Sequence, residues 1–221
     1  GQLRELSNAD MYVKVGSGLS FENLWMDRLI EVNPDMLVVD ASSGIQLRTM
    51  EAHSHDHEEE EHDHANESEE EHEEEHEDEH DHANESEEVH DHSAESKDPH
   101  IWTSPVEAQI MVENIYEGLV EIDPDNTELY TQNRDAYIAE LDTADADVRE
   151  VLADKEGSSF IVYHPAWGYF ADEYGLEQIA VEIEGKEPSV QDMQNLIDTA
   201  NEEGIKVIFV QSGFSTSSAQ T

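Results

Sequence analysis

Residues 51–97 form a tract of histidine, glutamate and aspartate with almost no apolar side chains. Such a segment cannot bury enough apolar surface to offset the entropy lost on ordering, so we expect a disordered loop. Within it, residues 62–70 recur unchanged as residues 80–88, which indicates an expansion inside a loop. The fold must therefore come from the roughly 170 residues on either side, enough for one large domain or two small ones.

The negative charge of the chain extends beyond this tract. The formal net charge is -46, and residues 51–98 hold 24 of the 56 acids and one of the ten bases, which leaves 32 acids against nine bases elsewhere. This balance excludes nucleic-acid binding through a basic face and favours the attraction of cations. The chain has no cysteine, so disulfides and thiolate metal sites are excluded as well.

Eleven of the thirteen histidines lie in the tract, mostly as His-x-His pairs. Imidazole and carboxylate groups are ligands suited to zinc, and also to nickel, copper and iron. Disordered ligands must be ordered on binding, so we expect loose, exchangeable sites that capture or buffer metal. A solvated acidic spacer with incidental histidines is the alternative. The predicted accessory ligands are His53, His55, His57, His62, His64, His72, His76, His80, His82, His90 and His92.

Outside the tract, short apolar runs alternate with helical patterns of apolar residues. The runs predict β-strands over residues 11–15, 36–39, 159–163, 179–183 and 205–210. The helical patterns predict helices between Ser20 and Pro34, over 105–122, over roughly 126–155, over 166–174 and between Ser189 and Gly204. Strands that alternate with helices favour parallel sheets, so the sequence indicates an α/β fold.

Local signals mark where three of these helices begin. Ser20 can cap the first, Ser104-Pro105-Val106-Glu107 combines a cap, a first-turn proline and a capping-box acid, and Ser189 pairs with Asp192. The helix over roughly 126–155 would be about 45 Å long at ~1.5 Å per residue. That length suits an element that spans two lobes.

The two remaining histidines lie in sequence that predicts order. His100 stands in Asp98-Pro99-His100-Ile101-Trp102, and His164 follows the predicted strand 159–163. The carboxyl ends of parallel strands are where α/β folds place ligands. We interpret both as placed metal ligands; the alternatives are a plain loop histidine at 100 and a helix-capping histidine at 164.

These motifs together resemble the zinc-uptake substrate-binding proteins of ABC transporters. The resemblance rests on Asp98-Pro99-His100-Ile101-Trp102, on His164-Pro165-Ala166-Trp167-Gly168-Tyr169-Phe170, and on Val207-Ile208-Phe209-Val210 before Gly213-Phe214-Ser215. It covers essentially the whole chain, and a histidine-rich insertion before the Asp-Pro-His segment is itself a trait of that family. It implies two parallel-sheet lobes joined by one long rigid helix: an N-terminal lobe over 1–122 that includes the loop 51–97, a linking helix over 123–156, and a C-terminal lobe over 157–221.

The resemblance also implies a metal site in the cleft between the lobes, with His100 and His164 as ligands. The family adds an early histidine and often a late carboxylate or water, and this chain has no match for either. We therefore expect a part of a longer protein, with any signal or lipid anchor ahead of Gly1. Manganese and iron relatives commonly place a glutamate at the position of His164, so histidine there favours zinc.

The function implied is that of an extracytoplasmic, membrane-anchored receptor that delivers Zn²⁺ to an ABC permease, acts as a monomer and catalyses no reaction. The alternatives are a manganese or iron receptor, a metal-dependent adhesin of the same fold, a zinc store, and a zinc hydrolase. The hydrolase has only His72-Glu73-Glu74-Glu75-His76 in its favour, inside low-complexity sequence. If the receptor interpretation holds, His100 and His164 must approach each other in space.

Overall fold

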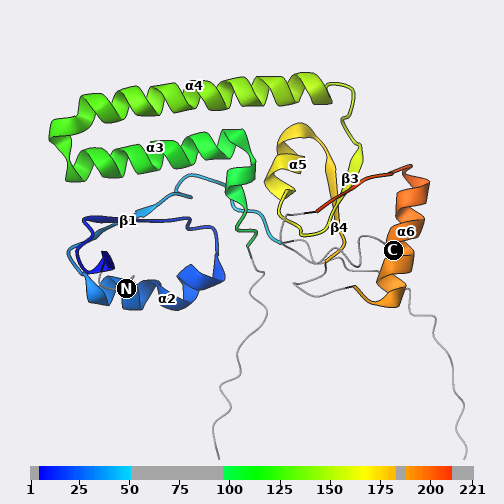
Figure 1. Cartoon of the computed structure of the whole chain (residues 1–221), viewed down its shortest axis with the longest axis horizontal. Coiled ribbons are helices and arrows are strands. Elements are labelled where there is room, and N and C mark those ends of the chain that lie inside the picture. Colours follow the sequence, from blue (N-terminus) through cyan, green and yellow to red (C-terminus); the bar gives the residue numbers. More distant parts are fainter. Residues whose placement is uncertain (1–4, 51–96, 183–187, 211–221) are drawn as a thin grey trace, which may run out of the picture. The chain divides into compact units, whose positions relative to one another are not determined.

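The structure is a computed structural model that describes residues 5–50, 97–182 and 188–210 (Figure 1). The predicted loop 51–97 lies outside these residues except for Lys97, and so do its eleven histidines. The residues that flank the loop meet each other: Thr49 and Lys97 form an isolated antiparallel bridge, and the Asp98 N–H donates to the Arg48 carbonyl at 3.0 Å. The tract is therefore an insertion whose two ends are adjacent.

The first sheet has two parallel strands, β1 (Met11–Lys14) and β2 (Leu37–Asp40), joined through α2 (Ser20–Val32). Both strands lie within one residue of their predicted runs. The prediction that Ser20 caps α2 is wrong, because Ser20 is its first residue and Leu19 precedes it without a side-chain cap. The turn ahead of the helix is held instead by Glu22, whose carboxylate accepts from the N–H groups of Val15 (2.6 Å) and Gly16 (2.9 Å).

Two long helices follow the insertion and lie side by side (Figure 1). A short 3₁₀ turn, η1 (Ile101–Thr103), leads into α3 (Pro105–Ile122), and a second, η2 (Pro124–Asn126), leads into α4 (Thr127–Leu152). The predicted start of α3 is confirmed, since the Ser104 hydroxyl accepts from the Glu107 N–H at 3.3 Å and Pro105 occupies the first position. Helix α4 has 26 residues, so it is about 39 Å long.

The second sheet has three parallel strands in the order β4-β3-β5. They are β3 (Ser159–Val162), β4 (Glu177–Ala180) and β5 (Ile208–Phe209), with α5 (Gly168–Tyr174) between the first two and α6 (Val190–Glu202) between the last two. Helix α6 begins with the predicted capping box of Ser189 and Asp192. It covers one face of the sheet, where Met193 and Leu196 pack on Ile161 and Val181.

The two parallel sheets and the long helix confirm the predicted α/β fold. The division into lobes at residues 122 and 156 stays a prediction. A second core joins segments from both halves of the chain, because buried Ile45, Ile101 and Tyr169 pack together with Val15 and Met111 against them. None of the helices among the described residues is long and apolar enough to cross a membrane.

Candidate metal centre

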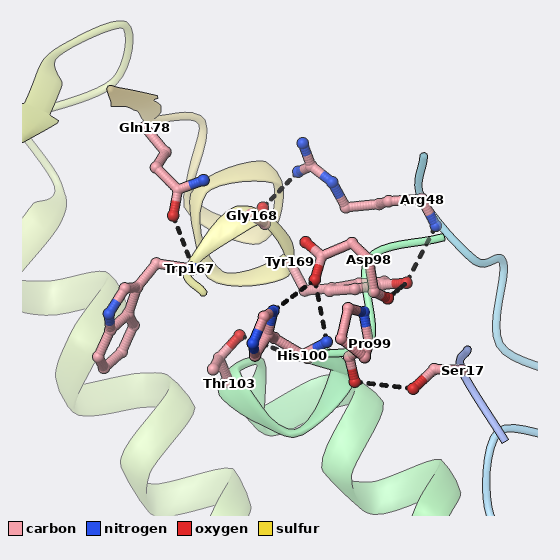
Figure 2. A network of polar contacts seen from close by, with 10 residues as sticks. All are labelled: Ser17, Arg48, Asp98, Pro99, His100, Thr103, Trp167, Gly168, Tyr169 and Gln178. Atoms are coloured by element: carbon pink, nitrogen blue, oxygen red, sulfur yellow. Dashed lines mark hydrogen bonds and ion pairs between the residues drawn. The ribbon is translucent and has the colours of Figure 1, made fainter. Parts of the chain in front are cut away.

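His100 lies on the short segment between the insertion and η1, and its ring is held by Asp98. The Asp98 Oδ1 atom lies 2.8 Å from His100 Nδ1 and also accepts the His100 backbone N–H at 2.9 Å. Two further contacts hold the segment: Ile101 is fully buried, and the Ser17 hydroxyl donates to the Pro99 carbonyl at 2.7 Å. Figure 2 shows His100 and Asp98 within this set of contacts. The position of the His100 ring is thus fixed by contacts on several sides.

His164 follows β3 at its carboxyl end, as predicted, and its ring contacts the carboxylate of Glu182, two residues beyond the end of β4. His164 Nδ1 lies 3.1 Å from Glu182 Oε2. The parallel register explains this contact. Val162 pairs with Ala180 in β3 and β4, and the ladder continues as the Glu182 N–H donates to the Tyr163 carbonyl at 2.9 Å. His164 and Glu182 each stand two residues beyond that pair, so they lie side by side.

The two histidine rings meet. Their centroids are 5.2 Å apart, with the ring planes at 81°, although 64 residues separate the two positions. The His100 side chain is 14% exposed and that of His164 is 24% exposed. The expectation that His100 and His164 approach each other is confirmed.

A buried tyrosine connects the His100 segment to helix α5 (Figure 2). The Tyr169 hydroxyl donates to the Asp98 carbonyl at 3.0 Å and accepts from the Arg48 N–H at 3.0 Å. Burial raises the pKa of Tyr169, so the hydroxyl keeps its proton and stays a donor. The Arg48 guanidinium donates to the Gly168 carbonyl and pairs with Asp172. Because α5 begins four residues after His164, this network ties the segments that carry the two histidines together.

The two carboxylates determine how each ring can act. A carboxylate oxygen accepts hydrogen bonds, so each of these contacts favours the tautomer that carries its proton on Nδ1. A neutral imidazole held in that way coordinates a metal through Nε2, the arrangement that most metal-ligating histidines use. Two imidazoles account for two of the four ligands of a tetrahedral zinc site. Within residues 5–50, 97–182 and 188–210, no cluster of three or more His, Asp or Glu could hold a metal by itself.

The roles of Asp98 and Glu182 were missed by the sequence reasoning, although both stand in segments that it singled out. A signal for Glu182 was present: it is an acid within the apolar run Ile179-Ala180-Val181-Glu182-Ile183. A charge at the end of a buried strand is costly unless it is paired, so it points to a nearby donor. For Asp98, the signal was its place two residues before His100.

Comparison with known proteins identifies the family. The whole chain, residues 1–221, matches the family described as the periplasmic component A of the zinc-uptake complex, ZnuA. The chain belongs to this ZnuA family. The chain is similar to the high-affinity zinc uptake system protein ZnuA of Bacillus subtilis (strain 168), with 42% identity over 126 residues. It is also similar to the zinc-binding protein AdcA of Streptococcus pyogenes, with 36% identity over 126 residues. Each alignment covers 56% of this chain but only 40% of the first relative and 24% of the second.

Solved structures of the ZnuA family share the fold. A crystal structure of ZnuA superposes with a TM-score of 0.75 at 34% identity, over 99% of this chain and 70% of that one. A ZnuA deletion mutant with zinc bound gives a TM-score of 0.72 at 32% identity, over 99% of this chain and 68% of that one. The laminin-binding protein Lbp of Streptococcus pyogenes, at 20% identity and a TM-score of 0.68, shares the fold alone.

Proposed function

We propose that this protein binds Zn²⁺ through His100 and His164 and acts as a receptor in zinc uptake. The observation that carries the proposal is the convergence of two imidazoles, with ring centroids 5.2 Å apart, each with Nδ1 beside a carboxylate that is buried in Asp98 and largely buried in Glu182. With Nδ1 engaged in this way, each ring has Nε2 as the nitrogen that could bind an ion. Membership of the ZnuA family supports the same cargo.

Zinc is the metal that this ligand set favours. The ion prefers nitrogen ligands at ~2.0–2.1 Å, whereas manganese prefers oxygen ligands. The family resemblance implies two further ligands beside these histidines: an early histidine, and a late carboxylate or water. A manganese or iron receptor would gain most from an oxygen ligand where His164 stands.

The acidic tract has an accessory role in this proposal. It leaves the fold after Thr49 and returns at Lys97, two residues that are bridged to each other. The tract rejoins the described chain at Lys97, three residues before His100. Its eleven histidines would hold several ions weakly and pass them to the site formed by His100 and His164.

The place and partners follow from the same proposal. We infer an extracytoplasmic receptor that works as a monomer, is held at the membrane and hands zinc to the permease of an ABC transporter. The family description as a periplasmic component supports the location. Binding and release of the ion are the whole activity, with no chemical reaction.

The experiment is a competitive zinc titration of the full-length protein with residues 51–96 replaced by a short linker, so that loose histidines do not mask the result. His100→Ala and His164→Ala should each weaken the tight site by at least tenfold, because each removes one nitrogen ligand. Gln109→Ala on α3 is the control and should leave the affinity unchanged. Unchanged affinity in both histidine variants would remove these residues from the site and overturn the proposal.

A further inference from the structure

We propose that Glu182 is a positioning residue of the metal site, which determines through which nitrogen His164 binds zinc. The inference rests on the proposed function and extends it from the ligands to the group that orients one of them. Its basis is the 3.1 Å contact between Glu182 Oε2 and His164 Nδ1, made by a glutamate side chain that is only 12% exposed.

The backbone fixes this contact. Parallel pairing sets Ile161 opposite Ile179 and Val162 opposite Ala180, and the N–H groups of Val181 and Glu182 continue the ladder to the carbonyls of Val162 and Tyr163 at 2.9 Å each. Residue 182 is therefore held in register with residue 164. Strand pairing places the backbones of residues 164 and 182 beside each other, which brings the Glu182 carboxylate within reach of the His164 ring.

The low exposure of the Glu182 carboxylate indicates that it needs a hydrogen-bond donor. The residues just before it, Ala180 and Val181, are buried and apolar. A carboxylate at the end of such a strand carries a desolvation cost that its surroundings offset only through a hydrogen-bond donor. The His164 ring supplies that donor at Nδ1.

The same contact leaves one coordination mode for His164. With the proton kept on Nδ1 by Glu182, the lone pair available for a metal is on Nε2. Without the carboxylate, Glu182 no longer holds the proton on Nδ1, and this constraint on the orientation of the ring is lost. Only part of the population would then present the geometry that zinc requires, so the affinity falls although no ligand has been removed.

Asp98 holds His100 in the corresponding way, but Glu182 is the better residue to test. Asp98 also accepts the His100 backbone N–H, and its carbonyl accepts from Tyr169, so changing Asp98 alters the segment as well as the ring. The Glu182 side chain contacts the ring from the segment that follows β4. A change there acts on the orientation of His164 with less effect on the backbone.

The test compares Glu182→Ala with Glu182→Gln in the full-length protein whose tract has been replaced by a linker. Glu182→Ala should weaken zinc binding by roughly 10- to 100-fold, the usual effect of removing a partner of a metal-ligating histidine. Glu182→Gln keeps an oxygen acceptor at the same place and should restore the affinity to within a few-fold of the parent. Glu177→Ala, which removes an exposed carboxylate from the first residue of β4, is the control and should leave the zinc affinity unchanged.

Three other outcomes separate the rival roles. If Glu182→Gln is as weak as Glu182→Ala, the carboxylate is itself a ligand and the positioning role is wrong. If both variants lose zinc affinity only in step with a lower melting temperature of the metal-free protein, the role is structural and the inference fails. If both bind zinc as the parent does while His164→Ala is weakened, the proposed function stands and only this inference fails.

The ring nitrogens give a further readout. In ¹⁵N NMR spectra of the zinc-bound protein, His164 should show a protonated Nδ1 and a coordinated Nε2 in the parent and in Glu182→Gln. Glu182→Ala should show a mixture of the two coordination modes or an exchange-broadened signal. A single Nε2-bound state in Glu182→Ala would overturn the inference. If His100→Ala and His164→Ala both keep tight zinc binding, the proposed function is wrong, and this inference is wrong with it.

Discussion

Tyr169 donates its hydroxyl proton to the backbone carbonyl of Asp98, 71 residues earlier in the chain, at 3.0 Å. The Tyr169 hydroxyl oxygen also accepts a hydrogen bond from the N–H of Arg48 at 3.0 Å, so this one side chain bonds to two backbone segments. Those two segments flank the insertion, and the second of them carries His100. A single hydroxyl thus joins the helix after His164 to the segment before His100.

Removing that hydroxyl should destabilise the protein. Tyr169→Phe keeps the buried ring but leaves the Asp98 carbonyl and the Arg48 N–H without this partner, at a cost of about 1–3 kcal/mol in the free energy of unfolding. Zinc affinity should fall as well, because the His100 segment loses a constraint. Denaturant unfolding of the metal-free protein and zinc titration measure the two effects.

The matched control is Tyr137→Phe, since Tyr137 is half-exposed on α4. It should change the unfolding free energy by less than about 0.5 kcal/mol, as surface substitutions usually do. Equal stabilities of the two variants would mean that the Tyr169 hydroxyl does not hold the two segments together.

Deletion of the tract should leave the fold and the tight site intact. Thr49 and Lys97 are already bridged, so a linker of about four residues can replace residues 51–96. For a tract as disordered as its composition predicts, shortening the connection by three to four halvings lowers the entropy cost of closure by about 2 kcal/mol, so the free energy of unfolding should rise by about that amount. Calorimetric titration should then find one tight zinc ion per molecule and several fewer weak ones. Loss of the tight ion would show that the tract supplies primary ligands.

Gly118 should tolerate no side chain, because helix α3 passes close to the first sheet there. A Cβ at this position would lie 2.4 Å from a methyl carbon of Val39 and 3.0 Å from the sulfur of Met11. Alanine gains about 1 kcal/mol of helix propensity, but overpacking against a stiff β-branched side chain costs about 1–3 kcal/mol. Gly118→Ala should therefore lower the unfolding free energy in chemical denaturation. The control Glu117→Ala, at the exposed neighbouring position, should be neutral or mildly stabilising.

Much of the fold could be predicted because its signals are local. The cap at Ser104 with Pro105 and the capping box of Ser189 with Asp192 each depend on a few adjacent residues, and both are present. The prediction that Ser20 caps α2 was wrong because the turn before α2 is held by Glu22, whose carboxylate accepts from backbone N–H groups six and seven residues earlier. That contact depends on the path of the loop, which a capping pattern does not encode.

The candidate site was predicted only in part for a similar reason. His100 and His164 stand in recognisable motifs, but their carboxylate partners depend on geometry. Glu182 reaches His164 only because β3 and β4 pair with Val162 opposite Ala180. A shift of one residue in that register would turn the carboxylate to the other face of the sheet. Sequence patterns indicate which segments are strands, but they do not determine how parallel neighbours align.

Metal choice should respond to a single substitution at His164. His164→Glu replaces a neutral nitrogen ligand with an anionic oxygen ligand, and oxygen-rich sites suit manganese better than zinc. In the full-length protein without its tract, the affinity for zinc should fall by an order of magnitude or more. The difference between the affinities for zinc and for manganese should become smaller. His100→Ala, by contrast, should weaken both metals, since it removes a ligand and adds none. Competitive titration with the two metals measures the gap directly.

The result of that experiment also depends on Glu182, because the carboxylate introduced by His164→Glu would lie beside it. Residues 164 and 182 each follow the last pair of adjacent parallel strands by two positions, so two carboxylates there would repel each other, and Glu182 would lose the imidazole donor. Combining His164→Glu with Glu182→Gln removes the repulsion and supplies an amide donor. The double variant should therefore bind manganese more tightly than His164→Glu alone, while its zinc affinity stays below that of the parent. If the second substitution leaves manganese binding unchanged, residues 164 and 182 do not share one site, and the arrangement inferred for Glu182 is wrong.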